Sequence, residues 1–253
     1  MAGHSQFKNI MYRKGAQDKK RARTFAKIAR EITAAAAAGN PDANPRLRAA
    51  ISAARAANMP KDNINRALKR AADRDSASLE EIRYEAYGPA GVALIIETLT
   101  DNRNRTSAAL RVLLSKNGGS LGETNSVAFL FRRVARLELP RENLEDDQAL
   151  ELALQINAQD CRQENDLHII TAAPEDLAAV RDSLAELTGH DISARLAWQP
   201  DTKQTLRKPE DARSLLALLD GLDDNEDVQH VYANFDVPAA LLESLAAETG
   251  AAA

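Results

Sequence analysis

The hydrophobic pattern of this chain changes at residues 73–78, from a helical period to strand-like runs. Before the change, one apolar stripe at helical spacing predicts a long helix over residues 17–38. The stripe consists of Phe25, Ile28, Ala29, Ile32 and Ala36. After the change, the unbroken apolar run 92–96 is typical of a central strand covered on both faces. We therefore expect an all-α part followed by an α+β part.

The all-α part is expected to be a small helical bundle over residues 1–77. Gly39 and Pro41 end its first helix, because glycine caps a helix C-terminus and proline cannot continue the helix. Further helices are predicted over 45–57 and 61–72, the last with Pro60 beside its first turn.

The remaining chain predicts two α+β domains, one inserted in the other. One domain is predicted to contain strands over 82–87, 92–99 and 126–131 and a helix over 103–116. A later helix over 209–219 and a strand over 228–235 are expected to return to the same domain. Between the two parts of this domain lie a strand, a helix, two strands, a helix and a strand, which is the order of a ferredoxin-like unit. These elements are predicted over 134–139, 144–157, 161–164, 167–171, 174–188 and 192–198. The expected domains are thus 1–77, 78–133 with 205–245, and the insertion 134–204.

Composition narrows the class of protein. The hydrophobic content of 44% is ordinary for a globular chain. The single cysteine, Cys161, permits no intramolecular disulfide and is typical of a reducing compartment. No apolar run approaches the roughly 20 residues that a membrane span needs, and the first residues lack the apolar core of a signal peptide. We expect a cytoplasmic protein with no membrane partner.

The charge is divided as sharply as the hydrophobic pattern. Of 33 Lys and Arg and 37 Asp and Glu in the chain, residues up to Asp75 hold 17 bases and six acids, and the remainder holds 16 bases and 31 acids. A concentrated basic block is the expected footprint of a protein that binds nucleic acid, because each neutralised phosphate releases counterions. An acidic remainder would confine that contact to one end of the chain.

Cations of the predicted helices are the first candidates for phosphate contacts. They are Lys19, Lys20, Arg23, Lys27 and Arg30 in the first helix, Arg48 and Arg55 in the second, and Arg66 and Lys69 in the third. The alternative is a merely solvated helix surface, as most charged faces are. Few Asn or Gln side chains are placed to read base edges, so the bundle lacks a convincing recognition helix.

The segment before the first helix combines cations with aromatic rings. Its cations are Lys8, Arg13 and Lys14, and its rings are Phe7 and Tyr12. This mixture suits single-stranded or structured RNA, whose unstacked bases can lie on the rings. A tail whose aromatic residues pack on the bundle fits the sequence equally well.

A further candidate is the segment 101–106, which follows a buried strand and opens a helix. Arg103 and Arg105 could face phosphate at the end of that strand. Alternatively, Asp101 or Asn102 caps the helix and Arg105 pairs with a carboxylate.

Other polar clusters have simpler interpretations. The glycines at 118, 119 and 122 end a helix and precede a strand, so they are expected to form a helix end and not a phosphate cradle. The acids at 220, 223, 224, 226 and 227 do not fit a calcium loop and are expected to be solvated or to dock on the basic helices and mask them. The histidines lack metal-ligand spacing and no nucleophile motif occurs, so we expect no catalytic residue, metal site or cofactor.

Long motifs throughout the chain resemble the YebC/PmpR family. They span residues 1–10, 16–18, 44–48, 58–64, 87–89, 99–106, 118–122 and 228–232. Phe7 stands where the family commonly has tryptophan, Met11 and Tyr12 replace a more basic pair, and Ala86 and Ala90 stand where glycine is frequent. The resemblance implies an N-terminal helical domain and two α+β domains, one inserted into the other.

The resemblance implies a non-enzymatic regulator of gene expression. Many family members are described as DNA-binding transcriptional regulators, which makes duplex DNA the first expected partner. The mitochondrial relative is a translational activator, and bacterial relatives are linked to stalled ribosomes. A ribosome-associated translation factor that binds ribosomal RNA is therefore the alternative.

Overall fold

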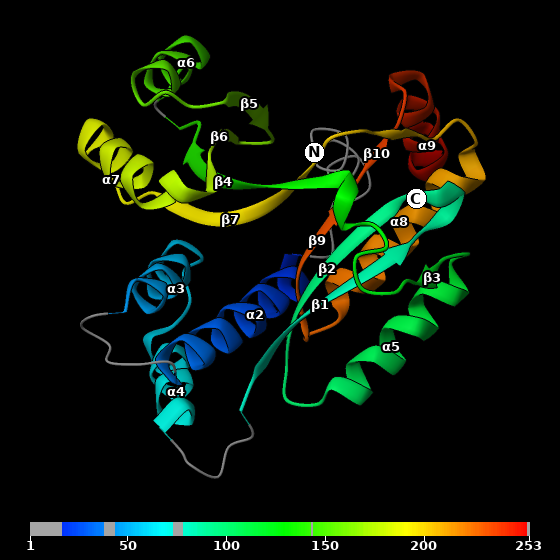
Figure 1. The fold of residues 1–253 in the computed structure, drawn as a ribbon, viewed down its shortest axis with the longest axis horizontal. Coiled ribbons are helices and arrows are strands. Elements are labelled where there is room, and N and C mark those ends of the chain that lie inside the picture. Colours follow the sequence, from blue (N-terminus) through cyan, green and yellow to red (C-terminus); the bar gives the residue numbers. More distant parts are fainter. Residues whose placement is uncertain (1–16, 38–43, 73–77, 143, 252–253) are drawn as a thin grey trace. The chain divides into compact units, whose positions relative to one another are not determined.

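A computed structural model describes residues 17–37, 44–72, 78–142 and 144–251. Among these, Phe131–Asp201 form one compact unit, and the described residues up to Leu130 together with those from Thr202 onward form the other. Both units combine helices with antiparallel strands, which confirms a mixed α+β fold (Figure 1).

The first helices lie close to their predicted positions. They are α2 (Gln17–Ala37), α3 (Pro45–Ala56) and α4 (Lys61–Ala72). Their shared core contains Ile32, Ala35, Leu47, Ala50, Ala54, Met59, Ile64 and Ala67. Asn44 caps α3 by accepting the Leu47 N–H at 3.1 Å, and its amide donates to the Ala35 carbonyl of α2 at 2.6 Å. One side chain thus starts α3 and fixes it to α2.

The strands that follow form a four-stranded sheet in the order β3-β1-β2-β9. Its members are β1 (Glu80–Tyr87), β2 (Ala93–Thr100), β3 (Ser120–Leu121) and β9 (Val228–Ala233). Residues 92–96 are completely buried, so both faces of β2 are covered, as its unbroken apolar run predicts. Pairing of β9 with β2 confirms that the late strand returns to this sheet.

Helices α5 (Arg103–Lys116) and α8 (Pro209–Asp224) accompany this sheet. Helix α5 packs against β1 and α8, and α8 packs against β9 and the turn Pro89–Gly91. Gly118, with φ +75°, ends the α5 region as expected. At Gly119, an added Cβ would lie 2.5 Å from the Tyr87 carbonyl oxygen, so only glycine fits where the chain returns to β1.

The expected strand over 126–131 is wrong. The chain forms a turn and a short 3-10 helix, Ala128–Leu130, and the strand β4 begins only at Phe131. The buried Glu85 carboxylate accepts the N–H groups of Asn125, Val127 and Ala128 at 2.8–2.9 Å, which turns the backbone around it. Burial raises the pKa of Glu85, but these three bonds outweigh it and lower the pKa below its usual value.

The unit Phe131–Asp201 shows the βαββαβ order that the sequence predicts. It contains β4 (Phe131–Pro140), α6 (Asp146–Gln155), β5 (Asp160–Glu164), β6 (Leu167–Ala172), a 3-10 turn (Pro174–Asp176), α7 (Leu177–Thr188) and β7 (Ser193–Pro200). The strands form an antiparallel sheet in the order β5-β6-β4-β7. Its core lies between one sheet face and the two helices, and contains Ala135, Leu137, Leu139, Ala153, Ile170, Ala172, Val180, Leu184 and Ile192.

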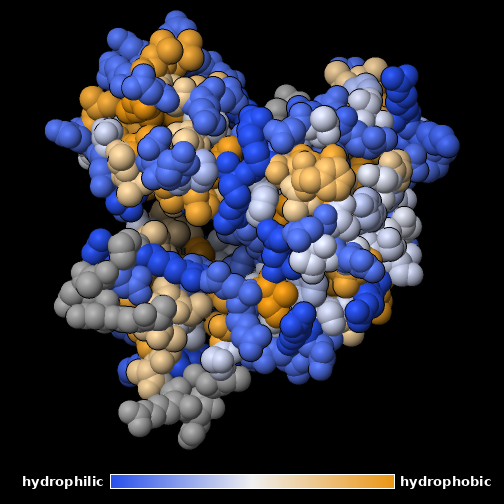
Figure 2. Space-filling model, viewed as in Figure 1, coloured by the Kyte–Doolittle hydropathy of each residue, from blue (hydrophilic) through white to orange (hydrophobic). Residues whose placement is uncertain are grey.

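The exposed apolar residues and the C-terminal elements complete the description of the fold. Hydrophobic residues gather over α6 and α7, where Leu150, Leu154 and Leu187 are each at least half exposed (Figure 2). Near the C-terminus, β10 (Phe235–Asp236) pairs in parallel with β8 (Gln204–Thr205), and α9 (Ala239–Ala251) follows. No helix in the described residues is long and apolar enough to cross a membrane.

Candidate nucleic-acid interface

Helices α3 and α4 carry cations on the side away from their shared core. The side chains of Arg48, Arg55, Arg66 and Lys69 belong to exposed residues. The Arg66 guanidinium donates to the Asn63 amide oxygen at 2.6 Å, which fixes it along α4 without neutralising its charge. Within the described chain, neither Arg55 nor Lys69 forms an ion pair. A phosphate that approached Arg55 or Lys69 would not have to break an ion pair within the described chain.

The cations of α2 have different surroundings. Arg23, Lys27 and Arg30 follow one another at helical spacing and face the acidic segment Asp223–Asp227, which contains Asn225 at its centre. Arg23 donates to Asp224 at 2.8 Å, and the Lys27 ammonium lies 3.7 Å from a carboxylate oxygen of Asp223. The predicted contact between the acidic residues and the basic helix is therefore present.

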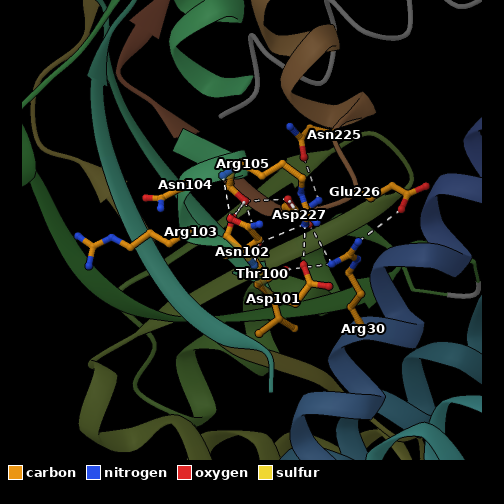
Figure 3. Close-up of polar contacts among 12 residues, drawn as sticks. Arg30, Thr100, Asp101, Asn102, Arg103, Asn104, Arg105, Asn225, Glu226 and Asp227 are labelled. Atoms are coloured by element: carbon orange, nitrogen blue, oxygen red, sulfur yellow. Dashed lines mark hydrogen bonds and ion pairs between the residues drawn. The ribbon is translucent and has the colours of Figure 1, made fainter. Parts of the chain in front are cut away.

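Arg30 reaches further into the same acidic segment. Its guanidinium lies 3.4 Å from a carboxylate oxygen of Glu226 and 2.9 Å from one of Asp227, and it donates to the Leu99 carbonyl at 3.4 Å. Figure 3 shows Arg30 directed at Asp227 and Glu226. Arg30 thereby connects α2 to the end of β2.

Asp227 is the buried centre of this cluster, with a side chain only 7% exposed. Its carboxylate accepts from the Thr106 hydroxyl at 2.7 Å and from the Arg105 guanidinium at 3.0 Å, in addition to Arg30. Thr106 also lies 2.8 Å from the Thr100 hydroxyl. A buried carboxylate needs such charged and hydroxyl donors, and here they come from α2 and α5.

The structure separates the two arginines of segment 101–106. Asn102 caps α5 by accepting the Arg105 N–H at 3.0 Å, and the Arg105 guanidinium donates to Asp101 at 2.7 Å as well as to Asp227. These hydrogen bonds raise the pKa of Arg105 and lower that of Asp101. Arg103 is exposed and points away from the cluster (Figure 3). Capping and pairing thus account for Asn102 and Arg105, whereas Arg103 faces solvent.

Several predicted binding residues lie where no side chain is described. Phe7, Lys8, Tyr12, Arg13 and Lys14 lie outside the described residues. Lys19 and Lys20 belong to α2, but their side chains are not among those described.

Sequence reasoning missed the buried part of the cluster. The sequence groups Asp227 with its acidic neighbours, and Thr100 and Thr106 carry no signal that joins them to it. The helix expected over 209–219 is also too short, because α8 continues to Asp224 and places Asp223 and Asp224 in its last turn.

The described residues contain no group of three or more His, Cys, Asp or Glu side chains arranged to hold a metal ion. Burial raises the pKa of the Cys161 thiol, which is the opposite of what activates a nucleophilic cysteine. The exposed polar groups on α3 and α4 named above are instead positively charged side chains.

Comparison with known proteins adds an independent finding. Residues 5–74 match the model of the TACO1/YebC protein N-terminal domain, and residues 79–235 match that of the TACO1/YebC second and third domain. A probable transcriptional regulatory protein of Zymomonas mobilis is 50% identical over 250 residues, covering 98% of this chain and 100% of that relative.

A solved structure is similar as well. The crystal structure of a conserved hypothetical protein from Aquifex aeolicus matches with a TM-score of 0.83 and 38% identity, covering 90% of this chain and 96% of that one. The family models span most of the sequence, and the relative from Zymomonas mobilis aligns along its whole length. The chain therefore belongs to the TACO1/YebC family.

Proposed function

We propose that this protein is a non-enzymatic, nucleic-acid-binding regulator that acts on transcription through duplex DNA. The observation that carries the proposal is the exposed cationic surface of α3 and α4, where Arg55 and Lys69 form no ion pair within the described chain. The relative from Zymomonas mobilis is named a probable transcriptional regulatory protein, which supports a role in transcription.

The proposed interface has a centre and a periphery. Its centre would be the exposed cations Arg48, Arg55, Arg66 and Lys69 on α3 and α4, which would hold backbone phosphates. The periphery would include the cations of α2 and the N-terminal segment, with Phe7 and Tyr12 available for stacking. Arg103 fits a phosphate contact better than Arg105 does, because Arg105 is already paired with two carboxylates.

The proposal assigns separate parts of the chain to separate roles. Residues 1–77 would bind nucleic acid, while residues 78–133 with 205–245 and the insertion 134–204 would form two further domains. The acidic charge of the later residues would repel phosphate and keep the contact on the helical domain.

The target can be identified by comparing two labelled probes of equal length and charge, a duplex DNA and a structured RNA hairpin. Anisotropy of each probe is measured with the full-length protein across salt concentrations. We expect affinity for the duplex to equal or exceed affinity for the hairpin, and to depend on the duplex sequence.

The outcome that contradicts a DNA target is also specific. Much tighter binding to the hairpin, together with co-sedimentation with ribosomal particles from DNase-treated lysate, would make ribosomal RNA the target. Absence of binding to both probes at low salt would contradict nucleic-acid binding altogether.

A further inference from the structure

We propose that the acidic segment Asp223–Asp227 is an internal competitor for phosphate that occupies the basic row of α2 until nucleic acid displaces it. The inference rests on the proposed function and adds regulation to it. It starts from the finding that Arg23, Lys27 and Arg30 each face a carboxylate of this segment.

The contact has the chemistry of a phosphate interface. Carboxylate and phosphate oxygens both accept from guanidinium and ammonium groups, so a nucleic-acid backbone can replace one with the other. Acidic residues 223, 224 and 226 supply three negative charges along a row of three cations. A phosphate backbone that follows α2 would meet the same cations.

The placement of these acids is unfavourable for α8 itself. Asp223 and Asp224 lie in the last turn of the helix, which contains no basic residue. A helix C-terminus carries partial negative charge, so carboxylates there are disfavoured and cations are preferred. The cations of α2 supply the compensation that α8 lacks, which gives these acids a partner outside their own helix.

The segment divides into an anchor and a mask. Asp227 is the anchor, because its buried carboxylate is held by Thr106, Arg105 and Arg30. Asp223, Asp224 and Glu226 form the mask, with side chains 38%, 48% and 68% exposed. Pairs this exposed are weak and screened by salt, so a polyvalent anion can displace them while the anchor remains in place.

This arrangement orders the events of binding. Arg55 on α3 and Lys69 on α4 are available at the outset, whereas Arg23 and Lys27 contribute only after Asp223 and Asp224 have been displaced. A short or weakly charged ligand would engage α3 and α4 alone. A long polyphosphate would also engage α2 and bind more tightly, so the mask selects against incidental anions.

The test neutralises the mask and leaves the anchor intact. The variant is D223N/D224N/E226Q, and anisotropy is measured with a labelled duplex and with the RNA hairpin described above. The control is E151Q/E186Q, which removes exposed carboxylates from α6 and α7, in the other compact unit. Circular dichroism checks that each variant folds.

We expect the mask variant to bind about three- to tenfold more tightly than wild type at low salt, with the difference shrinking as salt rises. The control should bind like wild type. Adding R23Q/K27Q to the mask variant should remove most of the gain, because two of the three cations that the mask covers are then missing.

The remaining outcomes separate the inference from the proposed function. If the mask variant and wild type bind nucleic acid equally well, the competitor is overturned and the proposed function stands. If the gain persists after R23Q/K27Q is added, it is a general charge effect and the competitor is again overturned. If no variant binds either probe, both the competitor and the proposed function fail.

Discussion

Asp224 and Asp227 lie three residues apart, yet their carboxylates have opposite surroundings. Asp224 is 48% exposed and faces one partly exposed arginine, Arg23. Asp227 is 7% exposed and accepts from a hydroxyl and two guanidinium groups. Burial decides how much each carboxylate contributes to the stability of the fold. Water screens the exposed pair, so losing it costs little. Buried donors that lose their acceptor remain desolvated, so losing the buried carboxylate costs more.

Removing the buried carboxylate should therefore be costly. We expect D227A to lower the free energy of unfolding by about 2–3 kcal/mol, since Thr106 and two arginines lose a charged acceptor. D224N should change it by about 0–1 kcal/mol. Chemical denaturation followed by circular dichroism checks both. Equal effects of the two substitutions would contradict the distinction between anchor and mask.

These residues also show what the sequence could predict of the site. The spacing of Arg23, Lys27 and Arg30 placed them on one helix face, and the acidic run suggested their partner. Charge and helical period are local properties, so they can be read directly. The burial of Asp227 depends on where β2, α5 and α2 meet, which no local pattern encodes.

At the scale of elements, the main strands and helices followed the hydrophobic period closely. One failure occurred where a distant polar group controls the backbone. Residues 126–131 have strand-like composition, but Glu85 draws three of the local N–H groups into a turn. The short strands β3 and β8, two residues each, are fixed by pairing alone and leave no periodic signal.

The sheet of the unit Phe131–Asp201 adds an electrostatic feature that crosses strands. Arg136 on β4 donates to Glu164 on β5 at 2.8 Å, and Arg162 donates to the same carboxylate at 3.1 Å. Burial alone would raise the pKa of Glu164, but the hydrogen bond and charge of Arg136, helped by Arg162, lower it to about 2.

This pKa shift makes the sheet sensitive to acid. Because the folded-state pKa lies below the ordinary value near 4.5, the contribution of Glu164 to stability is present above that value and is lost as pH falls toward 2. We expect E164Q to be less stable than wild type at pH 7 and to lose less stability between pH 5 and pH 2. Fluorescence of Trp198, the single tryptophan, reports unfolding of this sheet.

A matched substitution controls for the loss of one acid. E151Q, on the exposed side of α6, should leave the acid dependence of the Trp198 signal as in wild type. An unchanged acid profile for E164Q would show that the cross-strand pair does not govern the acid response.

At the scale of the whole molecule, the division of charge matters more than the net charge of −4. The residues up to Asp75 carry an excess of bases and the later residues an excess of acids, and the structure brings one acidic segment into contact with α2. The number of cations open to phosphate is thus smaller than the sequence suggests. It is set by packing as well as by composition.

The salt dependence of duplex binding tests the central claim most directly. Wild type, R55E/K69E and the control K203E/R207E, which reverses two exposed cations outside the helices, are titrated against one labelled duplex from about 50 to 200 mM salt. For wild type, we predict that log K falls linearly with log salt with a slope of several units. R55E/K69E should lose about tenfold or more in affinity at low salt and flatten the slope by about two, whereas the control should resemble wild type. A flat slope for wild type, or an equal loss in both variants, would contradict phosphate binding by α3 and α4.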